Sequence, residues 1–403
     1  MRILAITSWW PEPADNGIKL RISRLLRALA SADELHLLGM AQSPLDEAQR
    51  RAPLRYCDSA AAAPAAARAP THAARVASLW RAQPASVRAT WSEPFAELVR
   101  ERAATLKPDV VVAFELSSAP YALLVPDVPR VLDDLEMATI YDGFAAATGR
   151  RRLRAWLTWA KHRAYVRQVL RGFAAVSAVS AREQRLVRRL AAATLPVALV
   201  PNGADLPERQ AFITPEPDTL IYPGALSYAA NLDAMRYFVA AILPQLRAAR
   251  PAVRLRITGR ASADERIALA APPEVELTGF VPDVRPLVAR SWAEVVPLRQ
   301  GSGTRLKILE ALALGTPVVS TSKGVEGLEL EHGQHLLVAD TPASFAAATL
   351  LLLGQPALRA RLASAGQAAV AARYDWRVIG AQLVDLVRSV ATPRSATYVP
   401  QPG

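Results

Sequence analysis

Short apolar runs alternate with helical patterns along most of this 403-residue chain. Each run is bounded by turn signals or by an amphipathic stretch, which is typical of buried strands followed by helices. The predicted strands of the first half are residues 3–6, 35–38, 110–114, 130–132, 174–176 and 197–200. Those of the second half are residues 220–222, 253–258, 275–278, 295–298, 318–320 and 336–338. Strands that alternate with helices predict parallel sheets covered on both faces, and hence an α/β fold.

The segments between these strands divide the chain in two. We expect helices over residues 18–30, 73–83, 94–106 and 376–390, and a surface loop over the alanine- and proline-rich residues 59–70. Residues 206–217 are polar and punctuated by proline, as in a linker. Two such halves predict two Rossmann-like domains facing each other across a cleft. The expected divisions are residues 1–205, residues 206–375, a helix over 376–391 and a frayed tail over 392–403.

Composition fits a globular protein of two domains. Apolar residues make up 51% of the chain, and its length allows two separate cores. The single cysteine, Cys57, excludes an internal disulfide bond and favours a reducing compartment. Residues 1–7 predict a first strand and no secretory signal, and the longest uncharged stretch, residues 341–358, is interrupted by Pro342 and Pro356. We therefore predict a cytoplasmic protein without a transmembrane helix.

The net charge of +12 favours anionic partners. No zinc spacing, RNP-like aromatic strand or helix-turn-helix signature accompanies it, so we predict no nucleic-acid partner. An anionic membrane surface, at the inner face of the cell membrane, is the better candidate for peripheral contact.

Residues 149–172 are the candidate for that contact. They combine nine basic residues, His162 included, with Trp156 and Trp159. This composition is typical of an interfacial membrane helix. It also fits a helix of the first domain with a basic outer face. We slightly favour the second interpretation, because an apolar stripe could face the core. That stripe consists of Leu153, Leu157, Ala160, Ala164 and Leu170.

The strongest chemical signal is the segment over residues 301–319, GSGTRLKILEALALGTPVV, which follows an apolar run over 293–298. Gly301 and Gly303 let the backbone approach a ligand, and the free amides of a starting helix favour a phosphate. Lys307 and Glu310 share one helix face, while Arg305 falls in the first turn within reach of an anion. Amides and two cations suit a diphosphate, and a carboxylate suits ribose hydroxyls.

This segment resembles the donor-site signature of the family-4 retaining glycosyltransferases of the GT-B type. Further segments resemble the same family in the expected order: residues 11–21 (PEPADNGIKLR), 200–205 (VPNGAD), 222–231, 257–259 (ITG) and 278–286 (TGFVPDVRP). The resemblance covers most of the chain, more closely after about residue 195. It implies a GT-B fold with an acceptor-side N-terminal domain, a C-terminal domain that binds a nucleotide-sugar, and a last helix that crosses back to the N-terminal domain.

The donor is expected at the carboxyl ends of the strands, where doubly wound sheets bind ligands. The predicted binding residues are Gly17, Gly224, Gly259, Phe280, Val281, Gly301, Ser302, Gly303 and Thr304. By resemblance, Gly279, Phe280 and Val281 would line the base, while ordinary packing explains Phe280 about as well. Gly17 follows the predicted helix cap Asn16 and leaves the helix amides open, or it merely fits a tight turn.

The chain departs from the family at three positions. Many members carry an arginine and a lysine where this chain has Ala225 and Ala230, and a glutamate where it has Ser302. A diphosphate left unpaired in a dry site would be costly. We therefore expect Arg305 and Lys307 to carry the diphosphate charge; the alternative is that they form a solvated helix start.

The predicted catalytic residues are Glu310, Arg305, Lys307, Asp133 and Glu115. Glu115 and Asp133 each follow a strand, as do Asp134 and Glu136, and helix caps or solvated loop acids explain all four equally well. In the family, the leaving phosphate is thought to take the acceptor proton, so no carboxylate pair is required. The five histidines show no ligand spacing, so we predict no metal and no cofactor beyond the nucleotide-sugar substrate.

The sequence therefore predicts a retaining glycosyltransferase, of the hexosyltransferase class, that acts on a cell-surface polysaccharide or a lipid-linked glycan. This function belongs to exopolysaccharide biosynthesis and the cell envelope. A sugar-nucleotide epimerase or a phosphorylase on the same fold is the first alternative, although no pyridoxal-binding lysine context is present. A non-catalytic nucleotide-sugar-binding module is the second alternative.

Overall fold

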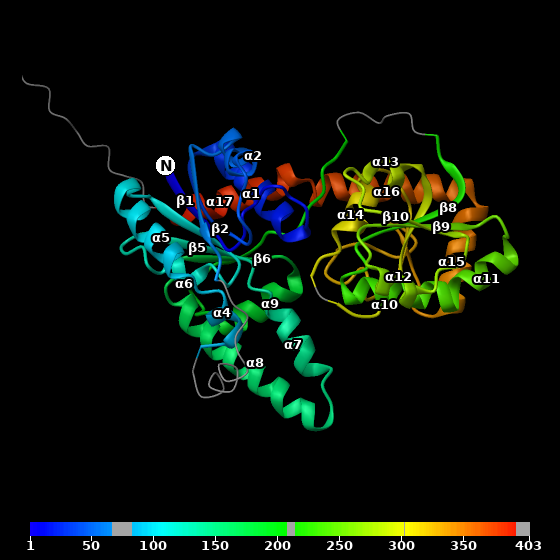
Figure 1. The fold of residues 1–403 in the computed structure, drawn as a ribbon, viewed down its shortest axis with the longest axis horizontal. Helices are drawn as coiled ribbons and strands as arrows, with labels where there is room; N and C mark the ends of the chain where they lie inside the picture. Colours follow the sequence, from blue (N-terminus) through cyan, green and yellow to red (C-terminus); the bar gives the residue numbers. More distant parts are fainter. Residues whose placement is uncertain (67–82, 208–213, 302, 392–403) are drawn as a thin grey trace, which may run out of the picture. The chain divides into compact units, whose positions relative to one another are not determined.

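The chain forms two compact units, each built around its own parallel sheet (Figure 1). Unit 1 comprises Met1–Pro201 and the chain from Ile379, and unit 2 comprises Asn202–Val378. The computed structural model describes all residues except 67–82, 208–213, 302 and 392–403. Unit 1 thus ends four residues before the predicted boundary, and most of the last helix belongs to it.

The described strands of unit 1 form one seven-stranded sheet in the order β3-β2-β1-β4-β5-β6-β7, in which neighbouring strands pair in parallel. Chain order reverses direction between β1 and β4. The strands are β1 (Arg2–Thr7), β2 (Glu34–Ala41), β3 (Ser59–Pro64), β4 (Val110–Phe114), β5 (Arg130–Asp133), β6 (Ala175–Ala178) and β7 (Val197–Leu199). The helices are α1 (Gly17–Ala32), α2 (Glu47–Arg51), α4 (Ala85–Ala89), α5 (Glu93–Leu106), α6 (Ala119–Ala122), α7 (Met137–Ala145), α8 (Gly149–Leu170) and α9 (Ala181–Leu190).

Unit 2 holds a six-stranded parallel sheet in the order β10-β9-β8-β11-β12-β13, which reverses between β8 and β11. The strands are β8 (Glu216–Pro223), β9 (Arg254–Thr258), β10 (Val275–Gly279), β11 (Ser291–Val296), β12 (Val318–Ser320) and β13 (Leu337–Val338). The helices are α10 (Ala229–Tyr237), α11 (Leu243–Ala249), α12 (Ala263–Leu269), α13 (Arg285–Arg290), α14 (Leu306–Ala313), α15 (Pro342–Gly354), α16 (Pro356–Arg373) and α17 (Trp376–Val390). Figure 1 shows α13 and α16 on one side of the sheet and α10 and α12 on the other.

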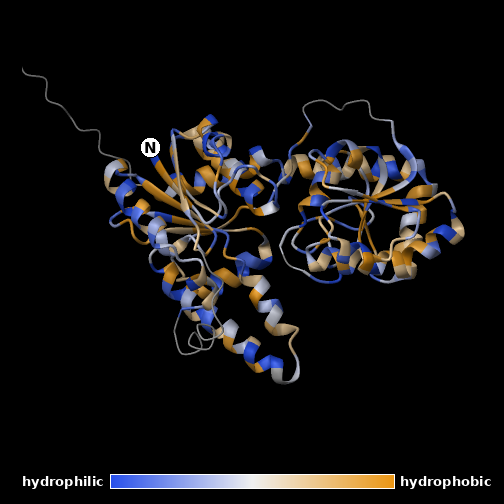
Figure 2. Ribbon diagram, in the orientation of Figure 1, coloured by the Kyte–Doolittle hydropathy of each residue, from blue (hydrophilic) through white to orange (hydrophobic). Residues whose placement is uncertain are grey.

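Both cores lie where the strand pattern predicts. Figure 2 shows strands that are mostly hydrophobic and helices that carry hydrophilic residues on their outer sides. In unit 1, β4 is buried throughout and packs with residues of α5 and α8. In unit 2, the buried residues of β8, β11 and α14 form one cluster. Strands covered on both faces must be apolar along their whole length, so the apolar runs located them correctly.

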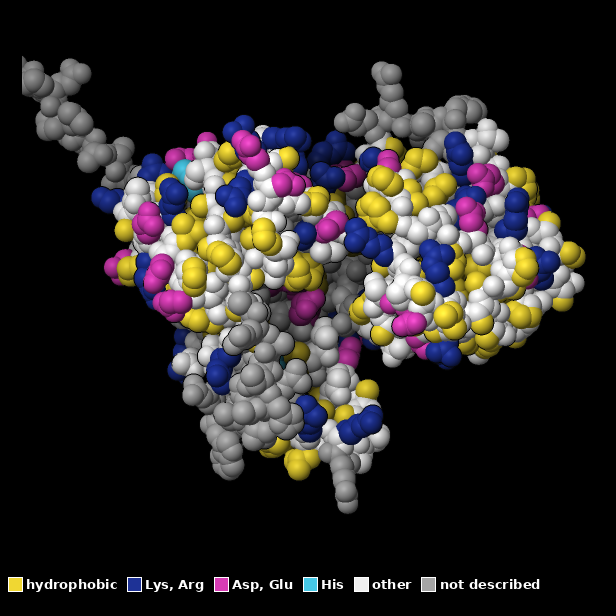
Figure 3. Space-filling model, in the orientation of Figure 1, with side chains coloured by type: hydrophobic (Ala, Val, Ile, Leu, Met, Phe, Trp, Pro, Cys, Tyr) yellow, Lys and Arg dark blue, Asp and Glu magenta, His cyan; other side chains and the backbone are white. Residues whose placement is uncertain are grey.

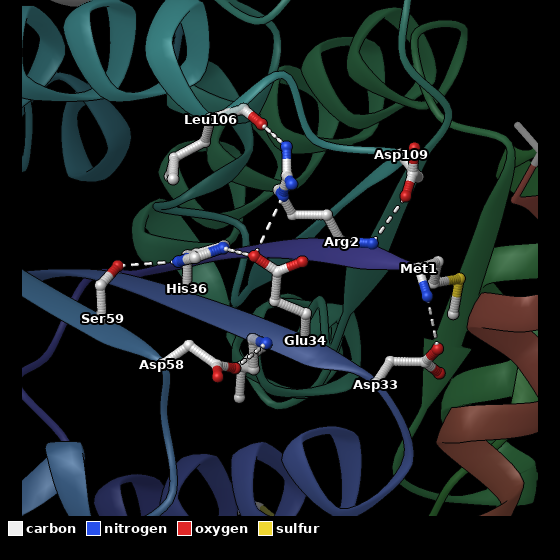
Figure 4. Close-up of polar contacts among 10 residues, drawn as sticks. Met1, Arg2, Asp33, Glu34, His36, Asp58, Ser59, Leu106 and Asp109 are labelled. Atoms are coloured by element: carbon white, nitrogen blue, oxygen red, sulfur yellow. Dashed lines mark hydrogen bonds and ion pairs between the residues drawn. The ribbon is translucent and has the colours of Figure 1, made fainter. Parts of the chain in front are cut away.

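A polar network fastens the amino ends of the strands in unit 1 (Figure 4). The Met1 amino group pairs with Asp33 Oδ1 at 2.8 Å, and the Arg2 amide donates to Asp109 Oδ2 at 2.6 Å. The Leu35 amide donates to Asp58 Oδ2 at 2.8 Å. These contacts satisfy backbone groups at one edge of the sheet. The opposite, carboxyl edge holds the loops that were predicted to bind ligands.

Two sequence predictions about elements need correction. Residues 59–64 form strand β3 instead of a loop, and β3 pairs in parallel with β2 from His36–Ser59 to Ala41–Pro64. Small alanine side chains give no apolar signal, and an edge strand tolerates the terminal proline because only one side is paired. The helix expected over 73–83 falls mostly outside the described residues. The last helix begins as predicted, and Arg388 Nη2 on α17 pairs with Asp33 Oδ2 of unit 1 at 3.0 Å.

Candidate functional site

Three glycines mark the carboxyl edge of the sheet in unit 2. Gly224 follows β8, Gly259 follows β9 and Gly279 ends β10. The Gly224 amide donates to the Thr258 carbonyl at 3.0 Å, and the Gly259 amide donates to the Gly279 carbonyl at 2.8 Å. Gly259 has a φ of +109°, and a Cβ there would lie 2.6 Å from the Ala225 amide nitrogen. Only glycine fits this close approach of two loops. The predicted binding residues Gly224 and Gly259 therefore shape this edge of the sheet.

The loop after β11 leads into α14. Gly301 and Gly303 have φ values of +106° and +79°, which side chains disfavour. Thr304 is half-buried, and Ser302 lies outside the described residues. Arg305 is buried and its Nη1 donates to the Gly303 carbonyl at 2.7 Å. The helix begins at Leu306, so Arg305 is the N-cap residue, without a capping hydrogen bond from its side chain, and it lies one residue before the first turn in which it was predicted. The extended loop keeps residue 305 outside the helix.

Lys307 extends from α14 to the end of β8. Its Nζ lies 3.7 Å from the centroid of the Tyr222 ring and 3.5 Å from Asn231 Oδ1. The Tyr222 hydroxyl donates to the same Asn231 oxygen at 2.6 Å, and Asn231 Nδ2 donates to the Ala225 carbonyl at 2.8 Å. A Cβ on Gly224 would lie 2.7 Å from Lys307 Nζ. The ammonium therefore occupies the point where the strand order of unit 2 reverses.

Burial sets the charge of this lysine. It lowers the pKa of Lys307 to about 7; the carboxylates of Glu294 and Glu310 raise that pKa, and Arg305 lowers it further. Glu310 shares the helix face with Lys307 as predicted, and burial raises the pKa of its carboxyl. The charge of Lys307 counteracts that rise, and so does the charge of Arg285 on α13. Sequence reasoning did not single out Arg285.

Glu294 is a second residue of this site that the sequence analysis missed. It lies on β11 and is fully buried, and neither carboxylate oxygen has a hydrogen-bond partner among the described residues. Burial raises the pKa of Glu294 well above its usual range, while the charge of Lys307 acts in the opposite direction. A carboxyl in a strand that is buried on both faces was the signal available, but the run was interpreted as apolar.

Phe280 is exposed beside the same edge and is not packed into the core. Its side chain is 57% exposed, and the Arg260 guanidinium lies 5.1 Å from the centroid of its ring. Val281 is half-buried. An exposed aromatic ring next to a cation offers a flat surface on which a base can stack. This observation favours the binding interpretation of Phe280 over ordinary packing.

The remaining predicted site residues lie in unit 1. Gly17 is the exposed first residue of α1, and the side chain of Asn16 caps the helix by accepting from the Lys19 amide at 3.0 Å. Asp133 is buried at the end of β5. Its carboxylate accepts from Arg21 Nη2 at 2.7 Å, from Arg21 Nε at 3.0 Å and from the Ser177 hydroxyl. Asp133 accepts three hydrogen bonds and is 1% exposed, so it connects the end of β5 to α1 and β6. This geometry does not support a catalytic role for it.

Glu115 is the acid in unit 1 that is best placed for chemistry. It follows β4 next to the reversal of strand order, with a φ of +66°, and accepts a hydrogen bond from the Ser8 hydroxyl after β1. Burial raises the pKa of Glu115 to about 7, although the Ser8 hydrogen bond lowers it, and the charges of Glu136 and Asp133 raise it further. A carboxyl that titrates near neutrality suits proton transfer.

No group of three or more His, Cys, Asp or Glu side chains in the described part of the chain is arranged to hold a metal ion. Among the helices that the structure describes, none combines the length and apolar character needed to cross a membrane.

Comparisons with known proteins agree with the architecture. Residues 217–355 match the model of the family Glycosyl transferases group 1. A phosphatidyl-myo-inositol mannosyltransferase of Mycobacterium leprae is 33% identical over 153 residues, which are 36% of this chain and 41% of the relative. The chain therefore matches less than half of that relative's length.

Solved structures match almost the whole chain. Sucrose-phosphate synthase from Thermosynechococcus elongatus superposes with a TM-score of 0.69 at 17% identity, covering 96% of this chain and 99% of the other. The Anabaena protein HepE in complex with UDP superposes with a TM-score of 0.66 at 16% identity, covering 96% of this chain and 100% of the other. The fold is the two-domain α/β fold of GT-B glycosyltransferases.

Proposed function

We propose that this protein is a retaining hexosyltransferase whose donor is a nucleoside-diphosphate sugar bound at the carboxyl edge of unit 2. The observation that carries the proposal is the Lys307 ammonium at the strand-order reversal, next to Gly224 and the loop of Gly301. Ligands of doubly wound sheets bind at such points. The match of residues 217–355 to a glycosyltransferase family supports the same conclusion.

Lys307 and Arg305 would take the place of the two cations that many family members carry after the first strand of this domain. Ala225 and Ala230 have no charge to offer, and Ala230 is buried. The Lys307 ammonium lies beside Gly224, the residue before Ala225. A cation from α14 thus lies next to the position at which many family members carry their arginine. A diphosphate there would make charge-assisted hydrogen bonds, which are stronger than neutral ones.

The remaining groups would position the nucleoside. Glu310, on the helix face of Lys307, is suited to accept hydrogen bonds from ribose hydroxyls. Phe280 offers an exposed ring for the base, with Val281 beside it. The structure of the Anabaena protein HepE contains bound UDP, which is consistent with a nucleotide site on this fold.

In the transfer, the bond between the anomeric carbon and the phosphate oxygen breaks, and the acceptor oxygen bonds to that carbon on the same face. The acceptor hydroxyl proton passes to the leaving diphosphate, whose negative charge Lys307 and Arg305 stabilise. Glu115, with a pKa near neutrality, is the residue of unit 1 that would orient the acceptor hydroxyl.

The acceptor is proposed to be a cell-surface polysaccharide or a lipid-linked glycan, at the inner face of the cell membrane. The similarity to a mannosyltransferase of a phosphatidylinositol lipid supports a lipid-linked acceptor. On this basis we propose a role in exopolysaccharide or cell-envelope biosynthesis.

Binding and turnover of a donor panel test this function. Purified protein is titrated with UDP-, GDP-, ADP- and dTDP-sugars and followed by proton NMR. We expect one donor to bind and to be hydrolysed slowly with retention at the anomeric carbon, and Lys307→Met to weaken binding strongly and to abolish hydrolysis. Epimerised donor would favour the epimerase alternative, and binding without any turnover, even with acceptor extracts, would favour the non-catalytic module. Failure of every donor to bind would refute the proposal.

A further inference from the structure

Helix α8 projects from unit 1, and its first three turns are exposed (Figure 1). Its second half is anchored in the core through Val166, Val169 and Leu170. Trp159, the first residue of α8 that belongs to that core, packs edge-on against Tyr141 of α7 at 5.3 Å between ring centroids. The described residues before it, from 149 to 158, are exposed apart from Ala155, which is half-buried.

The exposed turns carry large apolar side chains that a solvated helix would not need. Leu153 is 65% exposed, Trp156 is 48% exposed and Leu157 is 40% exposed. Their spacing of three and four residues puts them on one face. The interpretation favoured from the sequence is therefore wrong for Leu153 and Leu157, which do not face the core, while Leu170 of the same predicted stripe is buried. The core face is the opposite one, which includes His162 and Val166.

Arg152 and Arg154 lie on the two sides of this apolar face, and Arg151 lies behind it in the first turn of the helix. Arg151, Arg152 and Arg154 are exposed and have no acidic partner among the described residues. Arg163 and Arg167 continue the basic surface, and α8 contains no aspartate or glutamate. Figure 3 shows basic and hydrophobic side chains next to each other at the projecting end of the α7 and α8 pair. We call this surface, made of Leu153, Trp156, Leu157, Arg151, Arg152 and Arg154, the α8 tip.

We propose that the α8 tip docks on an anionic lipid surface. A convex helix tip with a tryptophan and two leucines among arginines matches the chemistry of the membrane interface, where apolar groups enter the acyl boundary and cations meet lipid phosphates. The charge complementarity selects anionic lipid over neutral lipid. The exposed apolar side chains at its centre make no polar contact with a nucleic-acid backbone, whereas they suit the acyl boundary of a lipid surface. This inference does not depend on the proposed sugar transfer.

Vesicle flotation tests the proposal with the full chain. Vesicles of phosphatidylcholine alone are compared with vesicles that contain 30 mole per cent phosphatidylglycerol, a composition chosen on the order of that of an anionic membrane. We expect binding to the anionic vesicles only, weakened by added salt. Neutralising Arg151, Arg152 and Arg154 to glutamine should weaken partitioning about 100-fold, since each surface cation contributes about fivefold.

The apolar contribution has its own variant and control. Trp156→Ser combined with Leu153→Ser should reduce flotation at least as strongly while the melting temperature stays unchanged, because both side chains are exposed in the free protein. Ile267→Ser, at a residue that is 76% exposed in unit 2, is the matched apolar control. The combination of Arg236→Gln, Arg254→Gln and Arg266→Gln is the matched charge control.

Equal binding to both vesicle types, or equal losses in the tip variants and their controls, would overturn the proposal. So would binding to nucleic acid, but not to vesicles, that the tip variants abolish. Donor binding is measured in the same variants and should not change, which separates failure of the docking surface from failure of the donor site.

Discussion

The pH dependence of donor binding should report the charge of Lys307. Burial holds the pKa of this lysine at about 7, and the groups that face it are Glu294 from β11, Glu310 from α14, Arg305 and the Tyr222 ring. Only the protonated ammonium can pair with a diphosphate. Binding should therefore be strongest below pH 7 and should take up a proton above it, because the bound anion raises the pKa of Lys307.

The magnitude follows from the fraction of protonated lysine. With a pKa of about 7, about one lysine in eleven is protonated at pH 8 and about one in thirty at pH 8.5. Relative to pH 6, donor affinity should thus be about tenfold lower at pH 8 and about thirtyfold lower at pH 8.5. These factors correspond to losses of about 1.4 and 2 kcal/mol in binding free energy. Burial raises the pKa of the Glu294 and Glu310 carboxyls near Lys307, so their protonation adds a second dependence at acid pH, and the comparison begins at pH 6.

Isothermal titration calorimetry measures both quantities. A nucleotide sugar is the ligand, because its diphosphate diester does not titrate between pH 6 and 8.5. Titrations at pH 8 in two buffers of different ionisation enthalpy should show uptake of close to one proton. Lys307→Met should bind weakly at every pH, without proton uptake, while Arg266→Met should behave as the unmodified protein. An affinity that stays constant within about twofold from pH 6.5 to 8.5 would refute the reasoning.

Four further predictions concern the same site. Glu310→Gln should weaken donor binding about 10- to 150-fold through the loss of charged hydrogen bonds, with an unchanged melting temperature; unchanged donor kinetics would contradict its role. Gly224→Ala adds a Cβ that would lie 2.7 Å from Lys307 Nζ, so it should displace the ammonium and lower donor affinity about tenfold, whereas Gly354→Ala, which has open space around it, should not. Glu294→Val should raise the free energy of unfolding by about 1–3 kcal/mol by removing a buried carboxyl without partners. Burial raises the folded-state pKa of this acid above the unfolded value of 4.5, so the buried carboxyl destabilises the fold increasingly as pH rises above about 4.5. The increase in the free energy of unfolding caused by Glu294→Val, measured by urea unfolding, should therefore be larger at pH 7 than at pH 4. Activity should survive chelation with EDTA, and loss that magnesium or manganese restores would reveal a metal site.

The sequence determined the elements of both sheets because their signals are local. The apolar run at β4 and the helix signals of α1 and α17 lie within a few residues of the observed bounds. The glycines after β11 needed positive φ values, which glycine adopts at no steric cost. The exception was β3, whose alanines give no apolar pattern and whose place depends on pairing with β2.

Only the tertiary structure decided which groups meet and which face of a helix is covered. Lys307 meets Tyr222 and Gly224 because β11 lies next to β8, although 80 and more residues separate them in sequence. The same neighbourhood places Glu294 near Lys307 and raises its pKa, which depends on burial and not on the residues before and after it. The covered face of helix α8 also depends on the tertiary structure. Periodicity identifies an apolar stripe on this helix but does not determine whether the core covers it. Packing of Val166 and Val169 against the core turns Leu153 and Trp156 outward. Local sequence thus determines the elements through sterics and periodicity, while the charge, burial and exposure of each side chain arise from contacts between distant segments.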